Sequence, residues 1–174
     1  MTTISYSSTM IRDLLDGRLP WPDTHKIMSG YKDADRFQKY RALVQETIGG
    51  SDPVVLPIGE RLVIVRSAAG LVVRCFCGFE FGDYRTNWKL AARIRVRDTE
   101  ESLEELYPGL RKCDPQWMEI RELICPGCAA LLEVEAVPPG YPLTFDFLPD
   151  LEGFYEDFLG EPLPERAPDG AVGP

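Results

Sequence analysis

The sequence has only one histidine, His25, among its 174 residues, and this scarcity limits the chemistry available to the chain. A metal cluster built from several histidines is excluded, and a Cys–His catalytic pair would need His25 itself. His25 follows Pro22-Asp23 in an expected loop or short helix, where a lone surface or packed histidine is the simpler interpretation. A phosphate loop is also lacking, because Gly78-Phe-Glu-Phe-Gly82 has no Lys-Ser or Lys-Thr after it.

Long apolar segments and an excess of positive charge are absent too. No apolar run approaches the roughly 18 residues that a membrane helix needs. The polar start, Met1 to Tyr6, shows no secretory signal, so we expect a cytoplasmic protein. The 19 Lys and Arg are outnumbered by 28 Asp and Glu, which gives a net charge of −9. An acidic chain suits a phosphate backbone poorly, so neither nucleic acid nor a membrane is an expected partner.

The charge is distributed unevenly along the chain. Residues 1–97 carry 15 basic and 10 acidic side chains, a net charge of +5, and residues 98–174 carry 4 basic and 18 acidic, a net charge of −14. The halves could attract each other, or one molecule could present opposite potentials to different partners. A basic stretch, with Arg93, Arg95 and Arg97 on one face of an expected strand, raises the same alternatives: neutralisation by the chain's own acidic half, by an acidic partner, or by a small anion.

The composition, 44% hydrophobic and 27% charged, is typical of a globular protein. The succession of expected helices and strands predicts an α+β fold. Residues 1–52 are expected to form N-terminal helices, one over Met10 to Leu15 and one beginning near Asp35, whose carboxylate would cap it. Residues 53–137 are expected to form a small antiparallel, zinc-ribbon-like β domain with an inserted strand and helix. An Asp98-to-Glu101 capping box would open the inserted helix.

The last segment, residues 138–174, is expected to be an extended aromatic tail with one short helix, from Asp150 to Leu159. Its aromatic side chains add more apolar surface than such a segment can bury alone. We therefore expect this tail to wrap its own domain or to dock on a partner.

The cysteines carry the clearest chemical signal. Their number, five, argues against a closed disulfide framework. Cys75 and Cys77, with Gly78, form one candidate metal-binding turn, and Cys125 and Cys128, around Pro-Gly, form the other. Four thiolates suit a closed tetrahedral zinc site, so these residues are predicted to hold structural zinc.

Other interpretations of the cysteines remain open. Some of them could be buried free thiols, the simpler role for Cys113. A redox Cys-x-x-Cys at Cys125 normally opens a helix, whereas the residues after Cys128 resemble a strand. No nucleophile, base and oxyanion pocket can be assembled, so no catalytic or cofactor-binding residues are predicted in this chain.

Longer motifs resemble a known family. They are Gly82-Asp-Tyr-Arg-Thr-Asn-Trp-Lys89 after Cys75-Phe-Cys-Gly78, Cys113-Asp-Pro-Gln-Trp-Met118, Cys125-Pro-Gly-Cys128, Leu132-Glu-Val-Glu-Ala-Val-Pro-Pro-Gly-Tyr-Pro142 and Phe145-Asp-Phe-Leu-Pro-Asp150. Together they resemble the small gamma subunit of bacterial acetone carboxylase over roughly residues 10–164. One departure is Ala129-Ala130, where the family often has glycine or a small polar residue.

The resemblance implies a non-catalytic, zinc-containing structural subunit of a hetero-oligomer, a heterohexamer with carboxylase alpha and beta subunits. Those larger subunits would bind ATP and manganese. They would catalyse a ligase reaction in which acetone and bicarbonate form acetoacetate, and the isolated chain would be inactive. The alternatives are the small subunit of an aromatic-ketone carboxylase, such as acetophenone carboxylase, and a free-standing zinc-ribbon adaptor. A small zinc enzyme would need an open metal position, which four cysteines would close.

Overall fold

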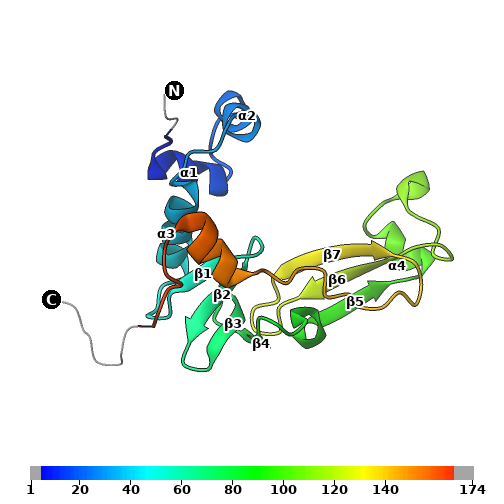
Figure 1. Cartoon of the computed structure of the whole chain (residues 1–174). Coiled ribbons are helices and arrows are strands. Elements are labelled where there is room, and N and C mark those ends of the chain that lie inside the picture. The colour runs from blue at the N-terminus through cyan, green and yellow to red at the C-terminus, as the bar shows by residue number, and fades with distance from the viewer. Residues whose placement is uncertain (1–4, 167–174) are drawn as a thin grey trace.

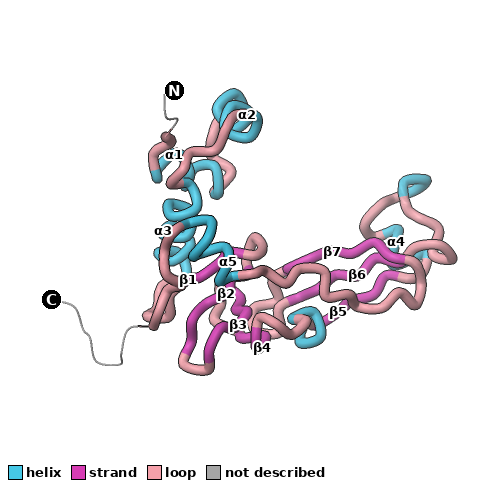
Figure 2. The backbone as a smooth tube through the Cα atoms, in the orientation of Figure 1, coloured by secondary structure: helices cyan, strands magenta, loops and turns pink. Residues whose placement is uncertain are grey.

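The computed structural model describes residues 5–166 and shows an elongated molecule (Figure 1). Three helices lie at one end, a four-stranded sheet lies in the middle, and a three-stranded sheet extends to the other end. Both sheets are antiparallel and connect neighbouring strands in chain order, as Figure 2 shows. The mixed helix and antiparallel-sheet composition predicted from the sequence is confirmed.

The N-terminal helices are α1 (Ser8–Leu15), α2 (Trp21–Ser29) and α3 (Arg36–Ile48). Ile11, Ile27 and Leu43, one from each helix, pack together in a small core. Of the loop or short helix expected around His25, the structure forms the helix: α2 begins at Trp21 with proline in its first turn. Proline is tolerated there since the first N–H groups of a helix have no partner within it.

Asp35 does not cap α3 with its side chain, contrary to the prediction. Its carboxylate instead accepts a hydrogen bond from Lys39 Nζ at 2.8 Å. The buried carboxylate is Asp33, which accepts hydrogen bonds from Arg36 Nε at 2.7 Å and Lys39 Nζ at 3.0 Å and from the backbone N–H of Tyr6 at 3.3 Å. Burial raises the pKa of Asp33, but these hydrogen bonds outweigh burial and hold the pKa well below its usual range.

The first sheet contains β1 (Val54–Pro57), β2 (Leu62–Ser67), β3 (Gly70–Cys75) and β4 (Glu80–Asp83). Its two faces enter different cores because successive side chains of a strand alternate. Val63 and Val65 of β2 pack with Val44 of α3, whereas Leu62 and Ile64 face the larger core. The central strand is apolar on both sides because both faces are covered.

The second sheet contains β5 (Arg93–Arg97), β6 (Glu119–Ile124) and β7 (Leu131–Val137). A 3₁₀ helix (Trp88–Ala91) leads into β5, and the β5–β6 connection holds α4 (Glu100–Glu104) and a second 3₁₀ helix (Gly109–Arg111). The predicted capping box is displaced by one residue: Thr99 and Ser102 form it, not Asp98 and Glu101. Hydroxyl groups replace both predicted carboxylates.

The arginine face of β5 is largely neutralised within the chain. Arg97 is 5% exposed and donates to Glu122 and Glu105, each at 2.7 Å. Arg95 donates to Glu105 at 2.8 Å. Ile94 and Val96 on the opposite face are 37% and 43% exposed, so the charged Arg97 is more buried than its apolar neighbours. For these two arginines the acidic half of the chain is the counter-charge.

The C-terminal segment crosses both sheets. After β7 it runs back along the second sheet and then forms one helical stretch, α5 (Leu151–Gly153) followed by a π-helix (Phe154–Leu159) (Figure 1). Leu151 and Tyr155 are 2% and 0% exposed in the larger core. The Tyr155 hydroxyl donates to the carbonyl of Val55 at 2.6 Å and accepts from Arg41 at 2.9 Å. Of the two alternatives, this part of the segment packs on its own domain.

A buried lysine joins this segment to the second sheet. Lys89 is 1% exposed, and its Nζ donates to Glu133 and Glu135 of β7 at 2.7 Å and to Asp146 at 3.1 Å. Burial lowers the pKa of Lys89, but the three carboxylates outweigh it and raise the pKa above its usual value. No helix among residues 5–166 is long and apolar enough to span a membrane.

Replacing Lys89 with methionine is expected to lower the free energy of unfolding by about 2–4 kcal/mol, because it leaves Glu133, Glu135 and Asp146 facing one another without a cation. Urea unfolding measures this loss. Lys112→Met is the matched control, since Lys112 also pairs with two carboxylates, Glu100 and Glu104, but these are about half exposed. The control should cost less than about 1 kcal/mol. Equal losses in the two variants would contradict a special role for Lys89.

Replacing Asp33 with asparagine tests the ion cluster beneath α3. Because the folded-state pKa of Asp33 is depressed, its ionisation stabilises the fold above the unfolded-state pKa near 4, and this contribution falls as the pH drops below that value. The melting temperature of the wild-type protein should therefore be higher than that of Asp33→Asn at pH 7. The difference between the two melting temperatures should shrink between pH 4 and pH 3. A gap that is constant with pH would show that the charge of Asp33 is unimportant.

Candidate metal centre

Two β-hairpins, one from each sheet, supply four of the five cysteines. Cys75 is the last residue of β3, and Cys77 lies in the turn that leads to β4. Cys125 directly follows β6, and Cys128 lies in the turn that leads to β7. The two turns meet where the sheets join, so 47 residues separate Cys77 from Cys125 in sequence while their side chains are neighbours.

The four sulfur atoms form a compact cluster. Every pair of Sγ atoms among Cys75, Cys77, Cys125 and Cys128 lies within 4.8 Å. The Sγ atoms of Cys75 and Cys128 are 3.8 Å apart, and those of Cys77 and Cys125 are 3.7 Å apart. These separations are far longer than the roughly 2.05 Å of a disulfide bond. Four thiols around one point can hold a metal ion.

The two turns share a backbone arrangement that directs the thiols inward. The N–H of Cys75 donates to the carbonyl of Phe79, and the N–H of Cys125 donates to the carbonyl of Ala130, each at 2.9 Å. The N–H of Gly127 points at Cys125 Sγ, 3.4 Å away. A Cβ at Gly127 would lie 3.0 Å from Phe79 Cβ and 3.2 Å from Cys77 Sγ, so the close approach of the two turns favours glycine there.

The residue after Cys128 is under backbone strain. Ala129 has φ 58°, in the left-handed region that favours glycine. Its N–H donates to the carbonyl of Cys125 at 2.9 Å, which closes the turn. The departure from the usual glycine or small polar residues therefore falls where the turn demands unusual dihedral angles, and costs on the order of 1 kcal/mol.

The protein environment shifts the pKa values of the Cys75, Cys77 and Cys128 thiols in different directions. Burial raises the pKa of Cys75 to about 12 and also raises the pKa of Cys77. The backbone N–H of Ala130 and the Cys77 thiol lower the pKa of Cys128 to about 7. A cation between the sulfurs would replace the thiol protons and stabilise all four thiolates, as metal binding does at cysteine sites.

Burial divides the cluster into an inner and an outer pair. Cys75 and Cys125 are 1% and 0% exposed and belong to the larger core with Trp88 and Leu123, whereas Cys77 and Cys128 are exposed. The cluster thus lies at the edge of the core and connects both sheets.

The remaining predicted candidates lie elsewhere. Cys113 precedes β6 at the end opposite Cys125, and its thiol faces the carbonyl of Met118 at 3.7 Å. His25 is exposed on α2 with its ring 5.9 Å from that of Trp21. Sequence reasoning missed the Lys89 cluster, although Glu133 and Glu135, on one face of an alternating strand, offered a signal.

Comparison with known proteins supports a single assignment. Residues 48–159 match the protein family described as acetone carboxylase gamma subunit. The acetone carboxylase gamma subunit of Xanthobacter autotrophicus strain Py2 is 46% identical over 167 residues, which cover 94% of this chain and 99% of that protein. The acetophenone carboxylase beta subunit of Aromatoleum aromaticum is 31% identical over 78 residues, 44% of this chain and 60% of that protein. With the family match over most of the chain and a relative aligned along nearly its whole length, the chain belongs to the acetone carboxylase gamma subunit family.

Proposed function

We propose that this chain is a non-catalytic, zinc-stabilised structural subunit of an acetone carboxylase. The complex would use ATP to carboxylate acetone with bicarbonate, giving acetoacetate, with ATP and manganese bound by the larger alpha and beta subunits. The observation that carries the proposal is the four-cysteine cluster at the junction of the two sheets, in a chain that belongs to a carboxylase subunit family. A cytoplasmic location is part of the proposal.

The spacing of the sulfurs supports zinc as the metal. Zinc–thiolate bonds are about 2.3 Å long, and a tetrahedron of that size has edges of about 3.8 Å. The 3.8 Å and 3.7 Å pairs match such edges. Cys75, Cys77, Cys125 and Cys128 would be the ligands. Four protein ligands fill a tetrahedral site and leave no position for substrate or water, which supports a structural role over a catalytic one.

A second candidate is the small subunit of a related aromatic-ketone carboxylase. The 31% identity to an acetophenone carboxylase beta subunit favours it. Acetone carboxylase is the better-supported complex, because its gamma subunit aligns with 94% of this chain and the acetophenone relative with 44%. A free-standing adaptor that binds nucleic acid is less well supported, since Arg95 and Arg97 already pair with carboxylates.

Replacing Cys125 with serine is expected to release the metal and unfold the region between the sheets. Structural zinc contributes on the order of 10 kcal/mol to folding in small domains, and Cys125 is fully buried in the cluster. Metal analysis of the purified protein should fall from one zinc per chain to nearly none, and the thermal transition should move down or vanish.

Cys113→Ser is the matched control for this experiment. Cys113 lies at the other end of β6, so the variant should keep one zinc per chain and a wild-type transition. Unchanged zinc content and melting in Cys125→Ser would contradict the proposed ligand set.

The proposed role also predicts an all-or-none dependence on partners. The purified chain should hydrolyse no ATP and carboxylate no acetone, while the larger subunits expressed with it should do both. Activity assays with bicarbonate and acetone, compared with acetophenone, test the role and the substrate together. ATP hydrolysis by the highly purified chain alone would refute a non-catalytic role.

A further inference from the structure

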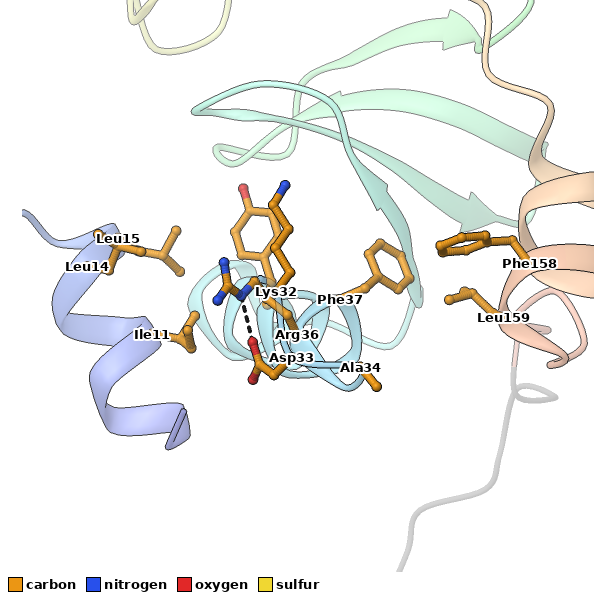
Figure 3. A pocket seen from close by; sticks show the side chains of 11 residues that line it. Ile11, Leu14, Leu15, Lys32, Asp33, Ala34, Arg36, Phe37, Phe158 and Leu159 are labelled. Carbon is orange, nitrogen blue, oxygen red and sulfur yellow. Dashed lines mark hydrogen bonds and ion pairs between the residues drawn. The ribbon is translucent and has the colours of Figure 1, made fainter. Parts of the chain in front are cut away.

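An apolar groove lies between α1, α3 and the C-terminal π-helix. Figure 3 shows Ile11, Leu14 and Leu15 on one side and Phe158 and Leu159 on the opposite side, with α3 between them. The groove has a volume of about 520 Å³, within the roughly 300–1,000 Å³ range of sites that hold a drug-sized ligand. Its apolar lining consists of Ile11, Leu14, Leu15, Ala34, Phe37, Tyr40, Phe158 and Leu159.

The two walls of the groove expose apolar side chains to solvent. Phe158 is 78% exposed and Leu15 is 48% exposed. Phe158 stacks on Phe154, with ring centroids 5.7 Å apart, whereas Tyr155, three residues earlier, is fully buried. A large aromatic side chain held outward beside a groove is typical of a binding surface rather than of the core.

The polar lining gives the groove a positive character. Asp33 lies in the lining but is already bonded to Arg36 and Lys39. Lys32 is exposed and has no ion pair within residues 5–166. Arg36 is bonded to Asp33 through Nε and its Nη2 atom is buried, so Lys32 is the cation of the lining that a ligand can reach. An apolar cavity with such a cation at its rim suits a ligand that is apolar and carries a carboxylate.

We propose that this groove binds a short segment of a larger carboxylase subunit in which apolar side chains lie next to an acidic one. The apolar side chains fill the space between Leu15 and Phe158, and the carboxylate meets Lys32. The inference rests on the proposed function, which supplies the larger subunit. A second copy of this chain fits less well, because a two-fold contact would place the same cationic rim on both partners.

Substitutions in the full-length chain that change a charge or an apolar side chain test the groove. In titrations of the purified chain against the purified larger subunits, Lys32→Glu and Phe158→Asp should each raise the dissociation constant of assembly at least about tenfold. The effect of Lys32→Glu should shrink at high salt, since an exposed charge is screened. Leu15→Glu places a charge on the opposite wall of the groove. It provides the test of the apolar contact if Phe158→Asp lowers the stability of the chain.

Two control variants isolate the groove. Lys26→Glu makes the same charge change on the exposed side of α2, outside the groove lining, and should assemble like wild type. Phe158→Leu keeps the apolar wall and should assemble within about threefold of wild type. All variants should retain the wild-type melting temperature and zinc content, because Lys32 and Phe158 are exposed.

The outcomes separate the two proposals. Normal assembly of wild type together with normal assembly of Lys32→Glu, Leu15→Glu and Phe158→Asp would overturn the groove and leave the proposed function intact. A wild-type chain that does not assemble with the larger subunits would overturn both. A dimer of the isolated chain that Phe158→Asp dissociates would assign the groove to a second copy and overturn the proposed occupant.

Discussion

The meeting of four thiols from two separate sheets is the constraint on which the arrangement of this protein depends. The sheets are separate hydrogen-bonded units, so backbone pairing alone does not set one against the other. Cys75 and Cys125 lie fully buried where the sheets join; Cys75 ends β3 of one sheet, and Cys125 directly follows β6 of the other. An error in the position of either strand would separate the sulfurs, because each turn holds its thiols through short backbone hydrogen bonds.

The C-terminal segment supports the same junction from outside. Asp146 reaches Lys89 just before β5, and Tyr155 reaches the backbone of β1. Lys89 is costly to bury, and three carboxylates offset that cost, of which Asp146 does so only while the segment stays on the sheet. The packing of the segment and the ionisation of Lys89 are therefore interdependent, and the acidic surplus of the C-terminal half has a structural use.

The elements that are confirmed are those with strong local signals. The helix predicted over Met10 to Leu15 corresponds to α1, and the strand predicted to carry Arg93, Arg95 and Arg97 is β5. The local spacing of the cysteines indicates two pairs, and the structure brings the two pairs together. Their role as zinc ligands stays a prediction.

What the sequence did not reveal depends on contacts distant in the chain. The capping residue of α4 was displaced by one position because several neighbouring polar residues can each cap a helix. The burial of Arg97 and the burial of Lys89 depend on packing against other elements, which no local pattern encodes. The division at residues 52 and 137 stays a prediction, and the segment after 137 contributes Leu151 and Tyr155 to the central core.

The hydrogen bond from Tyr155 to Val55 closes a loop of 100 residues, and the bond from Arg41 to Tyr155 closes one of 114. Contacts so distant in sequence slow folding, because the chain must find them before they stabilise anything. They also impose an order during synthesis: α3 and β1 leave the ribosome long before Tyr155 does. The early half of the chain must therefore wait, with Val55 and its neighbours still uncovered, until Tyr155 has been synthesised. Association with other subunits through any surface that includes Phe158 would consequently come after the synthesis of that helical stretch.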